Sequence, residues 1–146
     1  MTYRVNLAII VTGNISMKTR YKVLIGIAMV ILLIMIAMII AFNNIEKNLS
    51  HLADIDITEP EMNTISDGTY RGSYSAFPVS AIVDVTAQNS KIIEIRIVKH
   101  VHGQGSEAEV ITDDVISRQS VNVESISGAT YSSKVILLAI QDALTF

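Results

Sequence analysis

The residues best suited to chemistry in this sequence form a hydroxyl-rich stretch, "SISGATYSS", which runs from Ser125 to Ser133. The apolar run "KVILLAI" follows almost directly, and this pattern predicts a largely buried helix from about Thr130 to Leu144. The N-terminus of a helix presents unpaired N–H groups and the positive end of the helix dipole, so it attracts phosphate. Hydroxyl side chains at such a position either cap the helix or contact a bound phosphate, and the residue types alone allow both.

The small residues of this stretch are compatible with a bound ligand. Gly128 and Ala129 carry little or no side chain, so they let a phosphate approach the backbone closely. Thr130 adds a hydroxyl within the first turn of the predicted helix. The candidate binding residues are Ser127, Gly128, Ala129, Thr130, Tyr131, Ser132 and Ser133.

Three predicted strands and two predicted helices must position this stretch. Side-chain character alternates in three stretches, as in strands with one solvent-exposed face: "TYRGSY", "AIVDVTA" and "KIIEIRIVKH". In the third strand we expect Ile93, Ile95 and Ile97 on the apolar face. The polar "QNS" between the last two strands predicts a hairpin, and "SEAEVITDDVISRQ" predicts a helix before the final one. The predicted fold class is therefore α+β, a small antiparallel sheet packed against helices.

An uncharged stretch from Val23 to Phe42 predicts a single transmembrane helix. Roughly twenty apolar residues reach across the ~30 Å hydrocarbon core of a bilayer. A cleaved signal peptide is the alternative, but its apolar region is shorter, about 7–15 residues. Lys18, Arg20 and Lys22 precede the span, and basic residues favour the cytoplasmic side. We therefore expect a single-pass protein of the cell membrane whose C-terminal part lies outside the cytoplasm.

These signals divide the chain into four parts. We predict a cytoplasmic N-terminal segment at residues 1–22, a transmembrane anchor at 23–42, a linker or stalk at 43–66, and a domain at 67–146 that opens at a turn pair. Met1 and Met17 are alternative translation starts, and the sequence does not choose between them.

Composition excludes several classes of function. The chain has no cysteine, which excludes disulfides and cysteine-ligated iron–sulfur clusters. Its formal net charge is −3, and this mild acidity argues against nucleic-acid binding, which needs a basic surface.

Two motifs resemble the FMN-binding domain family, which includes the flavin-carrying subunits of the Rnf and sodium-pumping NADH:quinone oxidoreductase complexes. They are "SGATYSS" and, upstream, "DGTYRGSY". The similarity extends from Asp67 to Leu144 and includes the "VHGQG" turn and "VISRQS". The resemblance implies FMN as the cofactor. It also implies that a separate flavin transferase uses FAD as donor, releases AMP and esterifies the FMN phosphate to the threonine of the motif, here Thr130.

The resemblance implies roles for further residues. Gly103 and Gly105 correspond to a glycine turn that lies near the flavin, although they also simply permit a tight turn. Tyr131 either lies against the isoalloxazine ring or packs under the sheet. Family members often have Asp six residues before the acceptor threonine, where this chain has Glu124. Because Glu keeps the charge, we expect the transferase to recognise this position with somewhat altered efficiency.

His100 and His102 form an H-x-H pair at the end of the third strand. The pair lacks a clear third ligand, apart from the distant Glu107 or His51, so we predict no metal site. His102 either faces the flavin or lies in solvent. The sequence contains no Ser-His-Asp spacing, Walker motif or dinucleotide fingerprint, so we predict no catalytic residue.

The sequence therefore predicts a membrane-anchored redox carrier rather than a stand-alone enzyme. In this interpretation the FMN takes electrons from a membrane donor protein and passes them to an acceptor protein outside the cytoplasm. Two alternatives stay open: a sensor that binds flavin or another ligand non-covalently, and an interaction domain that carries no flavin.

Overall fold

A computed structural model describes residues 17–145 of the chain. The helices and strands follow in the order α1 (Met17–Asp54), β1 (Gly68–Ala76), β2 (Val79–Gln88), β3 (Lys91–Val101), α2 (Ile111–Arg118) and α3 (Thr130–Leu144). Two short 3-10 helices, η2 (Met62–Thr64) and η3 (Ser106–Val110), lie before β1 and before α2. The chain forms two compact units, Met1–Phe42 and Asn43–Phe146. Most of the predicted cytoplasmic segment, residues 1–16, lies outside the described residues.

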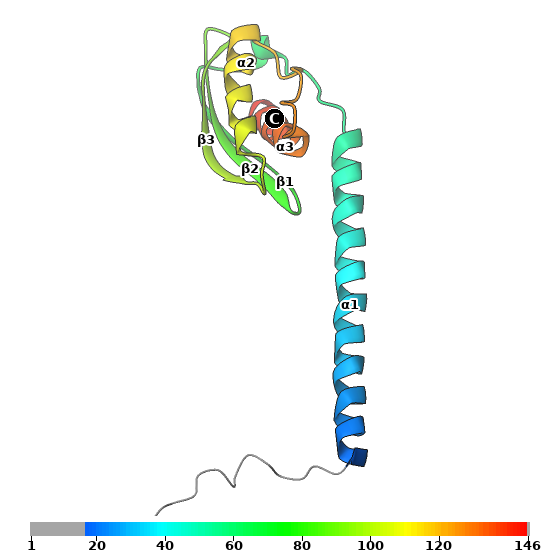
Figure 1. The fold of residues 1–146 in the computed structure, drawn as a ribbon. Coiled ribbons are helices and arrows are strands. Elements are labelled where there is room, and N and C mark those ends of the chain that lie inside the picture. The colour runs from blue at the N-terminus through cyan, green and yellow to red at the C-terminus, as the bar shows by residue number, and fades with distance from the viewer. Residues whose placement is uncertain (1–16, 146) are drawn as a thin grey trace, which may run out of the picture. The chain divides into compact units, whose positions relative to one another are not determined.

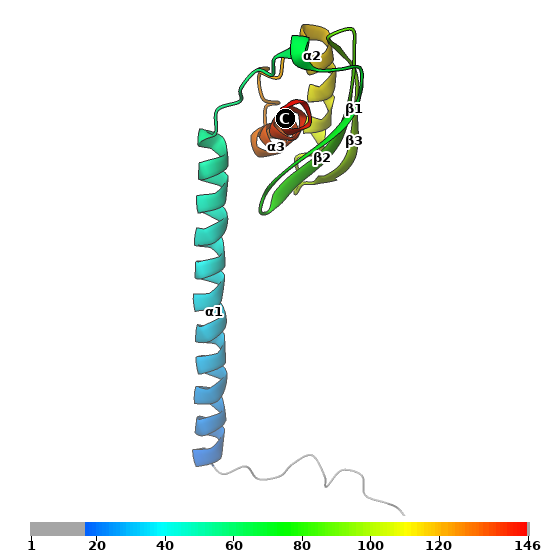
Figure 2. The same ribbon diagram turned by 180° about the vertical axis from the view of Figure 1, so that it is seen from behind.

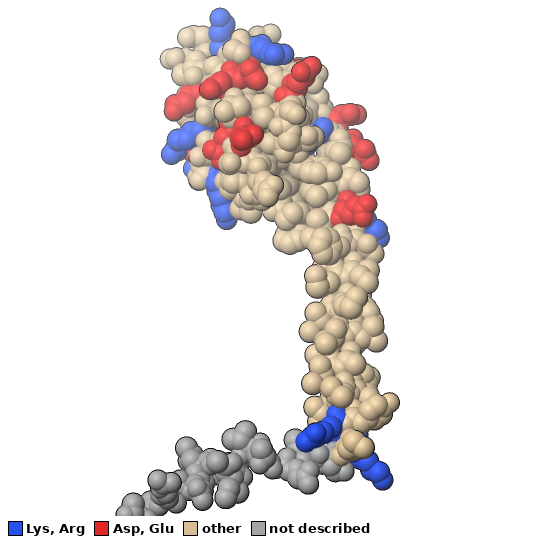
Figure 3. Space-filling model, in the orientation of Figure 1, with Lys and Arg blue, Asp and Glu red and all other residues tan. Residues whose placement is uncertain are grey.

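The helix α1 carries the predicted membrane span. Between Val23 and Phe42 it has no charged residue, and its side chains there are exposed. Figure 3 shows this uncharged surface between basic side chains at one end of the helix and charged side chains at the other. At 1.5 Å per residue, roughly twenty residues cover about 30 Å. Within residues 17–145, α1 is the one helix long and apolar enough to cross a membrane.

The strands β1, β2 and β3 form an antiparallel sheet with β2 in the middle. The turn between β2 and β3 consists of Asn89 and Ser90, which have φ angles of 52° and 58°. Two successive positive φ angles are typical of a type I′ turn, whose twist matches that of the flanking strands. The predicted hairpin is therefore confirmed. The connection between β1 and β2 contains a cis peptide bond between Phe77 and Pro78.

The two C-terminal helices cover one face of this sheet (Figure 1 and Figure 2). α3 packs across β1 and β2, whereas α2 packs against β3. Apolar side chains of α3 cover most of its circumference. Its buried residues include Val135, Ile136, Leu137, Leu138 and Ile140. The predicted α+β fold is confirmed, although the helix expected from Ser106 onward is divided into η3 and α2.

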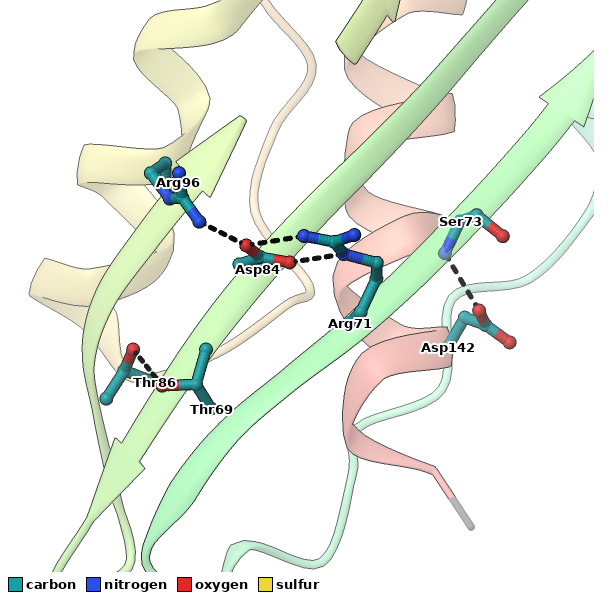
Figure 4. Close-up of polar contacts among 7 residues, drawn as sticks. All are labelled: Thr69, Arg71, Ser73, Asp84, Thr86, Arg96 and Asp142. Atoms are coloured by element: carbon teal, nitrogen blue, oxygen red, sulfur yellow. Dashed lines mark hydrogen bonds and ion pairs between the residues drawn. The ribbon is translucent and has the colours of Figure 1, made fainter. Parts of the chain in front are cut away.

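α3 approaches β1 closely at Gly72. A Cβ atom at this position would lie 2.8 Å from Cα of Ala143 and closer still to the carbonyl oxygen of Ala139, so a larger residue does not fit. The next backbone N–H of β1, that of Ser73, donates to the carboxylate of Asp142 at 2.8 Å (Figure 4). The glycine of "YRGSY" therefore allows the sheet and the helix that begins at Thr130 to pack together.

β3 departs from the predicted alternation. Ile92 and Glu94 pair with two consecutive residues of β2. Ile93, which lies between them, has no partner in β2 and is therefore the extra residue of a β-bulge. Ile92 consequently takes the buried position, and Ile93 is 50% exposed. The prediction that Ile93 faces the core with Ile95 and Ile97 is wrong, because a bulge changes the face on which the following residues lie.

The segment expected to be a linker, residues 43–66, contributes to the core of the second unit. Leu52 is fully buried. The carboxylate of Glu59 accepts hydrogen bonds from the backbone N–H groups of Val121 and Asn122, at 3.3 and 3.0 Å. These bonds hold the segment against the loop that leads into α3.

Candidate functional site

A shallow depression of about 240 Å³ lies where the glycine loop after β3 meets the start of α3. The loop contributes residues 103–105, and the start of the helix contributes residues 128–132. The rest of the lining is apolar and comes from Leu49, Pro78 and Val79. The structure therefore brings together two stretches that the sequence identified separately.

α3 begins at Thr130 without a capping side chain. Ala129 occupies the N-cap position, where no side chain accepts a hydrogen bond from the helix. The capping alternative is therefore not realised here, and the N–H groups of the first turn keep their capacity to bind an anion. Gly128 has a φ angle of +80°, which glycine adopts without strain, and it brings the chain into the helix.

Two of the predicted serines have contacts within the fold. Ser133 is fully buried, and its Oγ accepts a hydrogen bond from the backbone N–H of Ile126 at 3.0 Å. Ser132 is also buried and lies against Gly105. A Cβ atom at Gly105 would lie 2.8 Å from Cβ of Ser132 and closer still to its hydroxyl. Gly105 thus allows the loop to touch the start of the helix.

Thr130 and Tyr131 are the exposed side chains at the start of α3. Both line the depression, and Tyr131 is 41% exposed, so it does not pack under the sheet. Ser127 and Glu124 are exposed in the preceding loop and do not line the depression. Thr130 therefore carries the accessible aliphatic hydroxyl of the depression, next to the uncapped helix end, whereas Ser132 is buried.

Sequence reasoning did not find four of the lining residues. Gln104 lies between Gly103 and Gly105, which the sequence analysis did name as site residues. Its position in the same turn could have identified it as well. Leu49, Pro78 and Val79 are apolar and carry no chemical pattern, so only the folded chain identifies them as site residues.

Residues 74–145 match the sequence model of the FMN-binding domain. This part of the chain is an FMN-binding domain. The match includes both stretches that line the depression, and it indicates FMN as the cofactor. Comparisons with curated proteins and with solved structures give no significant match.

The depression of the FMN-binding domain suits parts of this cofactor. The uncapped N-terminus of α3 suits a phosphate group, and the apolar side chains of Leu49, Pro78 and Val79 suit an aromatic ring. Among the described residues, apart from Gly103 and its two chain neighbours, no atom lies within 4 Å of the position that a Cβ atom would take at Gly103, so space is open beside the loop. When bound, FMN supplies the redox chemistry, and the surrounding residues bind and orient it.

The opposite face of the sheet carries a buried carboxylate, that of Asp84 on β2. Arg71 on β1 donates two hydrogen bonds to it, at 2.7 and 3.0 Å, and Arg96 on β3 forms an ion pair with it (Figure 4). The hydrogen bonds from Arg71 lower the pKa of Asp84; burial opposes this effect, and the charges of both arginines reinforce it. The cluster connects all three strands on the face away from the helices (Figure 4), so its role is structural.

The H-x-H pair lies at the end of β3, with the ring centroids of His100 and His102 separated by 4.6 Å. The carboxylate that the fold brings to this pair is that of Glu109. Glu107 and His51, the third ligands considered from the sequence, do not belong to this cluster. The side chain of His102 does not line the depression.

Proposed function

We propose that this protein is a membrane-anchored electron carrier whose FMN is attached through its phosphate to the hydroxyl of Thr130. One observation carries this proposal: Thr130 is exposed at the uncapped N-terminus of α3 and lines the depression of the FMN-binding domain. The helix dipole and the free N–H groups stabilise the negative charge of a phosphate placed there.

The attachment step transfers FMN from FAD, and a separate flavin transferase catalyses it. Oγ1 of Thr130 attacks the phosphorus on the FMN side of the FAD pyrophosphate, which forms the new P–O bond. The bond from that phosphorus to the bridging oxygen breaks, AMP leaves with this oxygen, and the hydroxyl proton passes to a base of the transferase. Thr130 is thus the acceptor in this step, and Glu124 in the exposed preceding loop is a recognition point for the transferase.

The lining of the depression favours a carrier over an enzyme that converts a substrate. Among the described residues that line it there is no carboxylate, imidazole, amine or guanidinium group. These groups are the usual general acids and bases, and the phenol of Tyr131 is the one group of this kind among the described lining residues, so it has no second acid–base group beside it there. A volume of about 240 Å³ is also below the usual range for a pocket that encloses a small molecule, about 300–1,000 Å³. Part of the flavin then stays exposed, which suits electron exchange with donor and acceptor proteins.

The distribution of charge supports an orientation with the domain outside the cytoplasm. The basic residues Lys18, Arg20 and Lys22 precede the uncharged part of α1 (Figure 3). Basic residues favour the cytoplasmic side of a membrane span. A covalent bond is useful on the other side, where a dissociated cofactor is lost by dilution.

Co-expression with an active flavin transferase tests the proposal. The full-length protein should fluoresce as a flavoprotein on a denaturing gel, and its mass should increase by that of FMN less one water. Thr130→Val should remove both signals while the circular dichroism stays unchanged, whereas Ser127→Ala should keep the label as the matched control. A label that persists in Thr130→Val contradicts the site. Flavin that is present in the native protein and absent from the denatured band supports the non-covalent sensor, and a colourless protein supports the interaction domain.

A further inference from the structure

A second cluster of ligand-type side chains lies outside the depression. His100, His102 and Glu109 each offer one ligand atom, and these atoms lie within 4.8 Å of one another. His100 is in β3, His102 follows the end of that strand, and Glu109 belongs to η3. The fold therefore brings together two imidazoles and a carboxylate that the sequence did not join.

His100 is held rigidly in this cluster. Its side chain is 2% exposed, and its Nδ1 lies 3.0 Å from Oε1 of Glu109. Its Nε2 is buried and has no hydrogen-bond partner among the described residues. Nε2 is therefore the ring nitrogen of His100 that has no partner within the described fold, and a ring nitrogen with a free lone pair is what a metal ion binds.

His102 is oriented in a way that is common among metal ligands. Its Nδ1 lies 3.3 Å from the carbonyl oxygen of Gly103, so a proton on Nδ1 leaves Nε2 with a free lone pair. Histidines that bind metal usually donate their other ring N–H to a carbonyl or carboxylate. The two rings are tilted by 45°, so they do not stack face to face.

We propose that His100, His102 and Glu109 bind a divalent zinc-class cation. Two imidazole nitrogens and one carboxylate oxygen suit Zn²⁺ and its first-row neighbours, whereas Mg²⁺ and Ca²⁺ prefer oxygen ligands alone. In a tetrahedral site with bonds of about 2.0–2.1 Å, two ligand atoms lie roughly 3.4 Å apart, so the three ligand atoms, which now lie within 4.8 Å of one another, need only small side-chain movements to meet on one ion. The partly exposed side chains of His102 and Glu109 give an ion access from solvent.

A bound cation would join β3 to η3 on both sides of the glycine loop. Residues 103–105 of that loop line the FMN depression and lie between the two histidines and Glu109 in the chain. The ion would therefore restrain the loop without contacting the flavin attachment residue. Three protein ligands leave a fourth position open, and water is the simplest occupant.

A zinc titration of the full-length protein in detergent, purified without a polyhistidine tag and treated with a chelator, tests this site. Competition against a chromophoric chelator should show one Zn²⁺ per chain. Glu109→Gln and His102→Asn should each weaken binding at least about tenfold. Glu107→Gln, on the same 3-10 helix, and His51→Asn are matched controls that should bind as the wild type does.

Thermal unfolding provides an independent readout of the same site. Zn²⁺ should raise the Tm of the wild type and of Glu107→Gln, because a ligand that binds only the folded state stabilises it. It should not raise the Tm of Glu109→Gln. Equal zinc affinity in Glu107→Gln and Glu109→Gln, or no stoichiometric binding to the wild type, would overturn the proposal and leave the cluster as a hydrogen-bonded support of the loop.

Discussion

Gly105 and Ser132 meet so closely that a Cβ atom on the glycine would lie 2.8 Å from Cβ of the serine. This contact joins the loop after β3 to the first turn of α3, and both segments line the depression of the FMN-binding domain. Since Ser132 is buried, it has little room to move. The shape of the site therefore depends on one residue without a side chain.

Replacing Gly105 with alanine should separate the loop from the helix start. Because the buried serine has to shift, we expect the flavin-free protein to lose about 1–3 kcal/mol of unfolding free energy, as overpacked cores do. Chemical denaturation of the full-length protein measures this loss. Gly103→Ala is the matched control, since no described residue beyond its chain neighbours has an atom within 4 Å of its Cβ position, and it should keep nearly wild-type stability. Equal stability of both variants would show that the loop yields without cost.

Gly72→Ala should destabilise the domain more than Gly105→Ala does. The atoms near a Cβ at Gly72 are backbone atoms of α3, which cannot rotate away. The loss should reach or exceed the upper end of the 1–3 kcal/mol range. Gly68→Ala in the same strand is the control, because its Cβ would meet Tyr70 at an ordinary distance of 3.5 Å. Thermal unfolding of the two variants compares them, and a Tm for Gly72→Ala near that of Gly68→Ala contradicts the close-approach explanation.

Asp84 should make the stability of the domain depend on acid pH. The hydrogen bonds from Arg71 lower its pKa below the ordinary value, so the folded state holds the carboxylate ionised more strongly than the unfolded state does. Its contribution is present above the unfolded pKa and is lost as the pH falls through the lower, folded pKa. Wild-type Tm should therefore fall in acid below about pH 4.

The matched variants isolate this contribution. Asp84→Asn should have a lower Tm at neutral pH, because both arginines remain without their carboxylate partner. Its Tm should also fall less steeply below about pH 4, because the titrating group is gone. Asp56→Asn removes an exposed carboxylate and should reproduce the wild-type profile. If the Tm of Asp84→Asn falls in acid as steeply as that of the wild type, other groups cause the acid dependence of stability.

The orientation of α1 can be tested by cysteine labelling, because the chain has no native cysteine. Ser117→Cys places a thiol on an exposed position of α2, and Thr19→Cys places one before the uncharged stretch. In intact cells a membrane-impermeant maleimide should label Ser117→Cys and should label Thr19→Cys only after lysis. The reverse pattern would place the domain in the cytoplasm.

Local patterns predicted the elements of this fold well. α3 begins at Thr130 and ends at Leu144, as its apolar residues indicated, and the "QNS" turn joins two antiparallel strands. Each of these features depends on residues within one or two turns of one another. The bulge at Ile93 was not predicted, because it depends on how β3 pairs with β2 and leaves the alternation of residue types unchanged.

The sequence by itself determined the uncharged helix, the α+β fold and the two stretches that line the depression of the FMN-binding domain, because periodicity and glycine-containing motifs are local properties. The tertiary structure decided which side chains meet. It left Thr130 accessible, buried Ser133, added Leu49 and Val79 to the lining, and selected Glu109 over Glu107 as the neighbour of the histidines. These outcomes depend on the packing of segments distant in the chain, and a one-dimensional pattern does not contain those distances.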